Sequence, residues 1–129
     1  MSLHVELVSP ERILFSGEAD MVVCRTTDGD IAFMTNHAPL IGALGIGAVT
    51  IHVTGDGTER AAVHGGFVEV SHNQVTILSD VAELASQIDV VRAEEARARA
   101  ETALTREHDV ELEAALRRAE VRLLVARAA

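Results

Sequence analysis

The sequence predicts a β-sandwich of about ten short strands followed by a C-terminal antiparallel α-helical hairpin. All nine glycines and both prolines lie at or before Gly66. Up to about Glu83, short β-rich runs alternate with turn residues, a pattern typical of an all-β domain. From Asp89 onward the chain consists largely of Ala, Arg and Glu, which favour helix. We therefore expect a sandwich domain over residues 1–86 and a helix-turn-helix domain over residues 87–129.

The expected strands are separated by residues that favour turns. Pro10 fixes φ in one turn, and the Gly65–Gly66 pair tolerates positive φ in another. The glycines of residues 42–47 superficially suggest a phosphate-binding loop. This segment lacks the Gly-Lys-Ser/Thr ending and precedes a strand, so we interpret it as a turn. The expected strands are residues 3–8, 13–17, 19–26, 30–34, 40–44, 48–53, 58–63, 67–71, 75–78 and a short piece near Val81.

Two helices are expected after residue 88, with a break at residues 105–109. Asp89 can cap the first helix and Asp109 the second. The apolar stripes follow three-and-four spacing. They comprise Ala93, Ala96, Ala100 and Ala103 in the first helix, and Leu112, Ala115, Leu116, Ala119 and Leu123 in the second. Alanine removes little apolar area from water, so the hairpin is expected to be weakly held. Periodicity leaves two alternatives open, a hairpin that undocks and one that stays fixed.

Charge narrows the classes of partner. The formal net charge of −9 argues against affinity for nucleic acid or for an anionic membrane surface. The last helix is locally basic, and all basic residues of the chain are Arg. Arg118 and Arg122 are four residues apart and share a face. That face is either solvated or meets an acidic partner surface.

The sequence contains no convincing catalytic or metal site. Six histidines lack the spacing of metal ligands, and we expect His52 and His64 to point outward from strands. Cys24, the lone cysteine, lies in an apolar run and is expected to be buried. The chain also lacks a long apolar run and the features of a signal peptide. We therefore expect a soluble, non-catalytic protein that binds other proteins or small ligands.

Several segments together resemble the epsilon subunit of bacterial F-type ATP synthases in order and spacing. They are residues 8–20 (VSPERILFSGEAD), 29–40 (GDIAFMTNHAPL), 65–70 (GGFVEV), 75–80 (VTILSD) and 88–93 (IDVVRA). The resemblance implies a non-catalytic rotor subunit that binds the gamma subunit and rests on the ring of c subunits. It also implies a peripheral position on the cytoplasmic face of the bacterial membrane, through the complex alone, and no required cofactor.

The resemblance implies two sets of protein contacts. The c-ring would meet Asp28, Gly29, Asp30 and His37, although His37 could instead stabilise its own Pro39 turn. In the family, the hairpin folds against the sandwich or extends along gamma, where it inhibits ATP hydrolysis. In the extended state, the acidic segments of the alpha/beta catalytic head would meet Arg117, Arg118 and Arg122.

Some bacterial members also bind ATP as a regulatory ligand. The matching positions here are Glu83, Ile88, Asp89, Arg92, Ala93, Arg99 and Arg122. One further arginine expected in the final turn is replaced by Ala126, and Arg127 lies on a different face. Alternatively, Asp89 is only a helix cap and Arg92 only its salt partner. Two rival functions are a free-standing adaptor for an acidic protein and, less favoured, a small hydrolase or metal enzyme.

Overall fold

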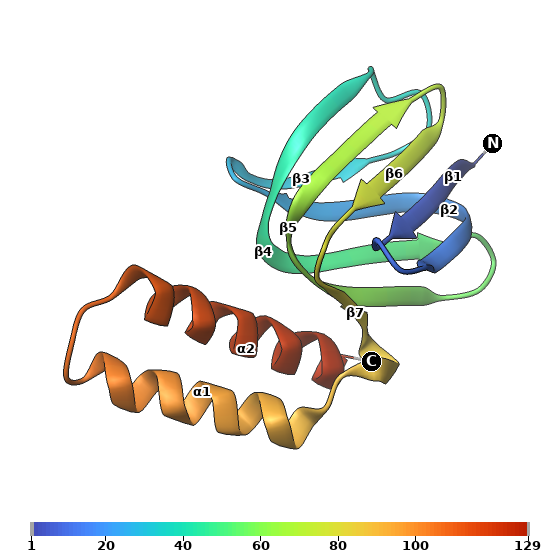
Figure 1. Ribbon diagram of the computed structural model, residues 1–129. Coiled ribbons are helices and arrows are strands. Elements are labelled where there is room, and N and C mark those ends of the chain that lie inside the picture. The colour runs from blue at the N-terminus through green and yellow to red at the C-terminus, as the bar shows by residue number, and fades with distance from the viewer. Residues whose placement is uncertain (1, 129) are drawn as a thin grey trace.

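Strands and helices occupy separate parts of the molecule in the computed structural model, which describes residues 2–128 (Figure 1). Its strands are β1 (Leu3–Val8), β2 (Ile13–Thr26), β3 (Gly29–Phe33), β4 (Leu40–Val53), β5 (Thr58–Ser71), β6 (Gln74–Leu78) and β7 (Ala82–Leu84). A short 3-10 helix, η1 (Ala85–Gln87), leads to the helices α1 (Val90–Leu104) and α2 (Val110–Ala128). The predicted division at residue 86 falls within η1.

The seven strands form one sheet that closes on itself. Their order is β1-β6-β5-β4-β2-β3, and β1 also pairs with β2, while β7 pairs with β5. All pairings are antiparallel except that between β1 and β6. Closure leaves fewer free strand edges and gives the predicted sandwich a barrel-like form.

The prediction of about ten strands was wrong in number. Residues 13–17 and 19–26 join as β2, residues 40–44 and 48–53 as β4, and residues 58–63 and 67–71 as β5. Each of these strands is 14 residues long. Accordingly, the segment that we interpreted as a turn, residues 42–47, lies inside β4.

Glycines let these long strands bend without ending. A Cβ at Gly47 would overlap the side chain of Arg25, and one at Gly66 would overlap the carbonyl oxygen of Leu78. Gly66 also has a φ of +117°, which side chains other than glycine rarely adopt. These glycines therefore mark close approaches of strands that still pair, whereas sequence reasoning treated them as strand ends.

The core of the sandwich consists mainly of branched aliphatic side chains around Phe33. The expected burial of Cys24 is confirmed, and burial raises the pKa of its thiol to about 12. The core comprises Leu3, Val5, Leu7, Ala19, Val22, Cys24, Phe33, Leu44, Val49, Ile51, Ala61, Val63, Val68, Val70, Val75 and Ile77. This cluster draws on five strands besides β3, so it holds the whole sheet together.

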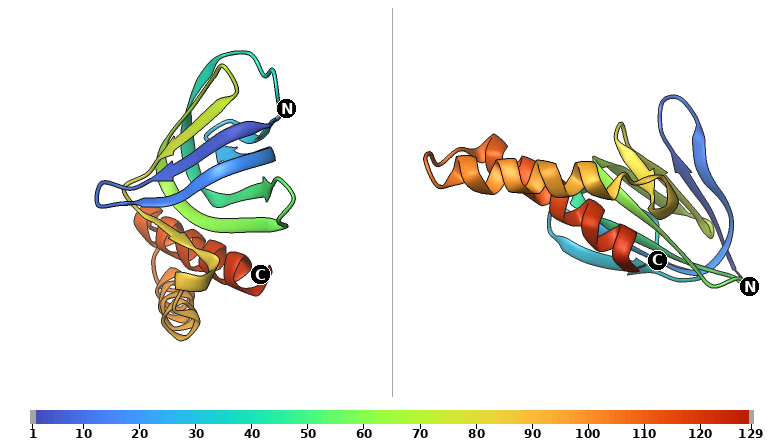
Figure 2. Two further views of the ribbon diagram at one scale, coloured as in Figure 1. Left: turned by 90° about the vertical axis from the view of Figure 1, so that its right-hand side faces the viewer. Right: turned by 90° about the horizontal axis from the view of Figure 1, so that it is seen from below.

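The two helices form the expected antiparallel hairpin. The Asp89 carboxylate accepts a hydrogen bond from the Arg92 backbone N–H at 3.1 Å, and the Asp109 carboxylate accepts from Glu111 and Leu112 at 2.7 and 3.3 Å. Both predicted caps are therefore confirmed. α2 lies between α1 and the sandwich and contacts β4 and β5, while the turn between the helices projects away from it (Figures 1 and 2).

Few hairpin side chains are fully buried. They are Ala93 and Ala100 of α1 and Ala119, Leu123 and Val125 of α2. Neither of these helices is long and apolar enough to cross a membrane.

Candidate functional site

A cleft of about 350 Å³ lies where the sandwich gives way to the hairpin. Its walls come from β7 and the residue before it, from the cap and the first ten residues of α1, and from Arg122 of α2. It is lined by Val81, Glu83, Asp89, Arg92, Ala93, Ala96, Arg99 and Arg122. Six of the seven positions predicted as a ligand site are thus brought together, although they span 40 residues of sequence. The seventh, Ile88, does not line the cleft.

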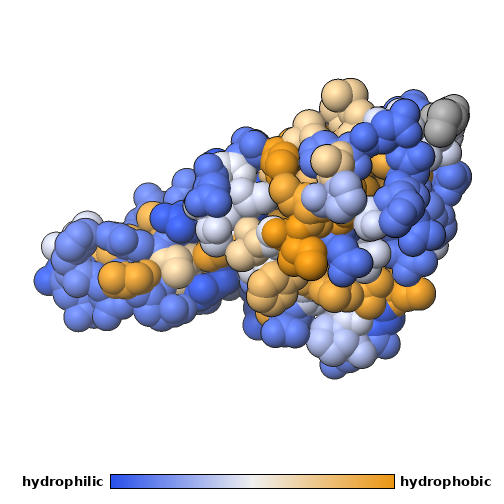
Figure 3. Space-filling model, turned by 90° about the horizontal axis from the view of Figure 1, so that it is seen from above, coloured by the Kyte–Doolittle hydropathy of each residue, from blue (hydrophilic) through white to orange (hydrophobic). Residues whose placement is uncertain are grey.

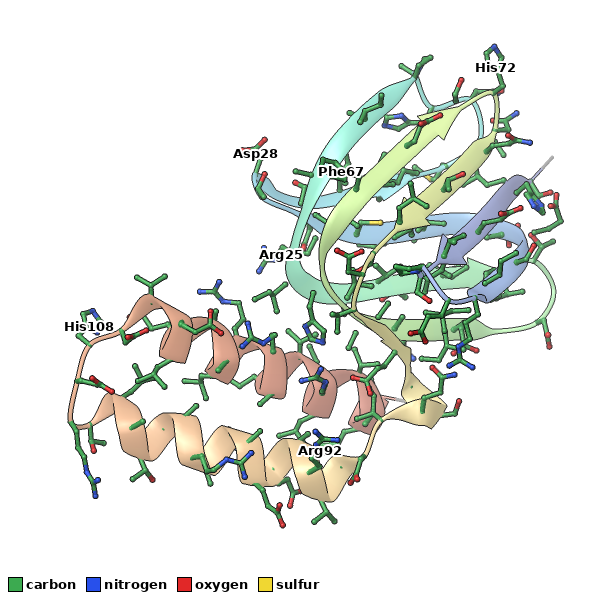
Figure 4. The ribbon with its side chains drawn as sticks, viewed as in Figure 1. Arg25, Asp28, Phe67, His72, Arg92 and His108 are labelled. Carbon is green, nitrogen blue, oxygen red and sulfur yellow. The ribbon has the colours of Figure 1, made fainter. Side chains whose placement is uncertain are left out.

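The cap at Asp89 positions the α1 side of the cleft. Because Asp89 fixes where α1 begins, the side chains of Arg92, Ala96 and Arg99 follow at spacings of four and three and share one face. Arg92 lies between the two helices at the sandwich end of the hairpin (Figure 4). Within residues 2–128, neither Arg92 nor Arg99 forms an ion pair. Asp89 is therefore a cap, but Arg92 is not its salt partner.

An ion pair crosses the cleft and connects the sandwich to the hairpin. Arg122 Nε of α2 donates to Glu83 Oε1 of β7 at 2.5 Å, and their side chains are 28% and 31% exposed. The cleft is thus lined by the guanidinium groups of Arg92, Arg99 and Arg122 and by the carboxylates of Glu83 and Asp89. Glu83 already pairs with Arg122. This excess of arginine suits an anionic ligand such as a phosphate group.

The last turn of α2 contributes no further cation to the cleft. Arg127 Nη2 donates to Glu94 Oε1 of α1 at 2.8 Å and so holds the two helices together. Arg127 lies on a different face from the cleft, and Ala126 stands where an additional arginine was expected. The site therefore has Arg92, Arg99 and Arg122 as its cations.

His64 of β5 lies beneath α2, beside the pair formed by Glu83 and Arg122. It does point outward from the sandwich core, as expected, but α2 covers it. Both ring nitrogens are buried and neither has a hydrogen-bond partner within the described residues. Burial, with a further contribution from Arg122, lowers its pKa to about 4. The groups that cover His64 are distant in the sequence, so no local signal could have revealed this environment.

The residues predicted to meet the c-ring fall into two separate places. Asp28 lies in the turn between β2 and β3, and Gly29 and Asp30 are the first residues of β3. Asp28 projects there from the edge of the sandwich (Figure 4). His37 lies beyond the opposite end of β3. Its Nδ1 lies 2.7 Å from the carbonyl oxygen of Ala38, and its ring packs edge-on against Phe33. The contacts of His37 are thus those of the alternative, a residue that stabilises its own loop.

The basic face of α2 is largely turned inward. Arg118 Nη2 donates to Glu111 Oε1 at 2.7 Å, and Arg122 pairs with Glu83. Both arginines also lie near His64, whose pKa they lower. In the docked hairpin these two side chains are thus partly covered, and they remain 31% and 28% exposed. Arg117 is exposed and lines a different cleft with Arg25.

An exposed apolar patch, which sequence reasoning missed, lies on the outer face of the sandwich. It comprises Ile41 of β4, Phe67 of β5 and Leu78 of β6, which are 75%, 59% and 50% exposed. Phe67 and Leu78 are direct neighbours across β5 and β6. Apolar surface gathers on the sandwich, while the hairpin is mostly hydrophilic on the face shown in Figure 3. Val68 and Val70 flank Glu69, and this period-two pattern could have indicated that Phe67 faces outward with Glu69.

Comparison with known proteins places the whole chain in one family. The family described as "ATP synthase, Delta/Epsilon chain, beta-sandwich domain" matches residues 2–85. The ATP synthase epsilon chain of Streptomyces coelicolor is 49% identical over 124 residues, which cover 96% of this chain and 94% of that relative. The epsilon chain of Streptomyces griseus is 49% identical over 116 residues, covering 87% and 94% of the two chains.

Solved structures share the fold at much lower identity. A chain of the Euglena gracilis mitochondrial ATP synthase, in a structure of OSCP, F1 and the c-ring, has a TM-score of 0.74 at 18% identity, covering 98% of this chain and 78% of that one. A chain from the central stalk and c-ring of the Tetrahymena thermophila mitochondrial ATP synthase has a TM-score of 0.62 at 14% identity, covering 99% and 96%. On the strength of its match to the bacterial relatives, the chain belongs to the ATP synthase epsilon chain family and is a non-catalytic subunit of that complex.

Proposed function

We propose that this chain is a rotor subunit of the central stalk of a proton-translocating ATP synthase, where it couples the gamma subunit to the c-ring. The observation that carries the proposal is 49% identity to a bacterial epsilon chain over 96% of the chain, which includes both the sandwich and the hairpin. The complex holds the chain at the cytoplasmic face of the membrane. No cofactor takes part, because the subunit makes and breaks no bond in the substrate.

The patch of Ile41, Phe67 and Leu78 is the surface that we assign to the gamma subunit. Three large apolar side chains at least half exposed on adjacent strands are unusual on a monomer and typical of a protein interface. The turn at Asp28 and the start of β3 at Asp30 are assigned to the polar loops of the c-ring, since they present two exposed carboxylates. The sandwich would thereby contact both partners and transmit torque between them.

Binding to gamma tests this assignment. In purified complexes or in a pull-down with gamma, Phe67→Glu should reduce recovery of gamma at least tenfold. Val110→Glu is the matched control, because Val110 is an equally apolar and even more exposed residue on the hairpin. Recovery of the chain without gamma in every preparation would refute the proposal and would favour a free-standing adaptor.

The hairpin is assigned a regulatory role. When it leaves the sandwich, Arg122 loses its pair with Glu83. It can then join Arg117 and Arg118 in binding acidic segments of the catalytic head, which inhibits ATP hydrolysis. The small apolar contact of α2 supports this role, because a switch requires two arrangements of similar free energy. In the docked state, Glu83 holds Arg122 and so opposes inhibition.

The cleft between β7 and the hairpin is assigned to ATP as a regulatory ligand. It gathers three arginines, two of them without an ion-pair partner among the described residues, from two helices that must be docked for the cleft to exist. A ligand held there would favour the docked hairpin by its differential affinity for that state. ATP would therefore relieve inhibition.

Calorimetric titration of the isolated chain tests the ATP site. We expect heat of binding with ATP and at least a tenfold weaker affinity for Arg92→Ala. Arg97→Ala is the matched control, since Arg97 lies on the same helix, pairs with Glu101 and does not line the cleft. No heat at millimolar ATP, or an equal loss in both variants, would refute the assignment.

A further inference from the structure

His64 occupies an unusual place at the contact between the two parts of the molecule. It lies in β5 opposite Ile46 of β4, and its backbone N–H donates to the carbonyl oxygen of Val81 at 3.0 Å. Its neighbour Val63 points into the core. The imidazole of His64 therefore points the other way, toward α2. With α2 docked, both ring nitrogens are buried and neither has a hydrogen bond among residues 2–128.

The charged groups around the ring are unfavourable to an imidazolium. Arg118 and Arg122 face it from α2, and Glu83 faces it from β7, while its neighbour Ile46 in β4 carries no charge. Glu83 is the only carboxylate of this set and already pairs with Arg122. A proton on His64 would therefore add a third positive charge to a poorly hydrated contact.

We propose that His64 couples docking of the hairpin to pH: α2 docks over the neutral imidazole, and protonation of the ring releases it. The inference rests on the proposed release of the hairpin and adds a signal that drives it. The unpaired ring also weakens docking at every pH, because a buried polar group without a partner costs free energy. His64 thus helps to keep the two arrangements close in stability.

The direction of the effect follows from linkage. Docking lowers the pKa of His64 from its ordinary value of 6.5 to about 4, mainly through burial. Docking is therefore fully favoured above pH 6.5 and is progressively lost as pH falls toward 4. Within the proposed function, a fall in cytoplasmic pH would favour the extended, inhibitory hairpin.

The distance between the hairpin turn and the sandwich measures docking directly. Spin labels would be attached to the full chain at Asp56→Cys, in the turn between β4 and β5, and at Glu107→Cys, between the helices. Both positions are exposed, and buried Cys24 should not react. Double electron–electron resonance at pH 7.5, 6.5, 5.5 and 5.0 then gives the ratio of docked to released hairpin.

We expect this ratio to fall by roughly threefold to thirtyfold between pH 7.5 and 5.0. In His64→Leu the ratio should be higher and independent of pH. His64→Gln should also be independent of pH but should not share the tighter docking, because the amide remains a polar group under α2. The other five histidines are present in both variants, so they serve as internal controls. If His64→Leu does not fold, His64→Gln still separates titration of His64 from titration elsewhere.

Two results would overturn the inference. The first is that the docked and the released distance are both present, but their ratio does not change with pH or changes equally in the wild type and the two variants. His64 is then not the coupling group, and the proposed release still stands. If a single docked distance is found under all conditions, the release itself is refuted, and the inference with it.

Discussion

The sandwich and the hairpin are held by different kinds of contact. A continuous cluster of fully buried Val, Leu and Ile around Phe33 holds the sandwich, with strands that pair along their lengths. The hairpin docks through α2, which packs on β4 and β5. Among residues 2–128, the side-chain hydrogen bonds between the two parts are the pair formed by Glu83 and Arg122 and a bond from Arg60 to the carbonyl oxygen of Ala128. The comparison teaches that the part to which we assign attachment has an extensive core, whereas the part to which we assign regulation has a small contact.

The free energy that buried side chains contribute also differs between the sandwich and the hairpin. A buried Val, Leu or Ile contributes about 1.5–3 kcal/mol relative to exposure, and an alanine contributes much less because it carries one methyl group. Three of the five fully buried hairpin residues are alanines. Conditions that leave the sandwich folded should therefore be able to free the hairpin.

Truncating the aromatic core residue should produce the largest effect on the sandwich. Phe33→Ala removes a ring that is 0% exposed and should lower the free energy of unfolding by about 3–5 kcal/mol. Phe67→Ala is the matched control, because it removes the same ring from the surface and should change stability by less than about 0.5 kcal/mol. Urea unfolding followed by circular dichroism measures both. Similar losses in the two variants would contradict the assigned core.

Substitution in the bend of β5 should lower the free energy of unfolding nearly as much as Phe33→Ala. Gly66→Ala adds a methyl group that meets the Leu78 carbonyl at a φ of +117°, so we expect a loss of about 2–3 kcal/mol. Gly55→Ala, at a φ of +70° in open space, should cost about 1 kcal/mol. Thermal unfolding distinguishes them. If Gly66→Ala is no worse than Gly55→Ala, the strands do not approach each other as closely as described.

Loss of the ion pair across the contact should affect the hairpin alone. Glu83→Gln should weaken docking by about 1–2 kcal/mol, because Arg122 keeps a neutral acceptor in place of a carboxylate. Glu111→Gln is the control, since Glu111 pairs with Arg118 within α2. Hydrogen exchange should show faster exchange in α1 and α2 for Glu83→Gln and unchanged protection in β4 and β5. Faster exchange in the strands as well would mean that the two parts unfold together.

The sequence was most informative where structure depends on near neighbours. The caps at Asp89 and Asp109, the break between the helices and the bounds of β1 follow from local chemistry, and the structure bears them out. Local reasoning failed at Gly47 and Gly66, because a glycine that ends a strand cannot be distinguished from one that makes room for a crossing strand without knowledge of what lies opposite.

The cleft could likewise not be predicted from neighbouring residues alone. The positions of the cleft came from a family resemblance, and only the fold could show that Glu83 reaches Arg122 across 39 residues. That Arg118 and Arg122 share a helix face could be predicted from their spacing. The direction of this face, toward His64 and away from solvent, depends on how α2 docks and has no signature in the sequence.

ATP hydrolysis by the complete complex tests the central claim most directly. Complexes would be assembled with the full chain, with a chain ending at Ile88, and without the subunit, and hydrolysis and proton pumping would be measured in each. The account predicts that the truncated chain binds and preserves pumping while hydrolysis rises, and that omission of the subunit impairs pumping. Equal hydrolysis with full and truncated chains, together with pumping that does not depend on the subunit, would contradict it.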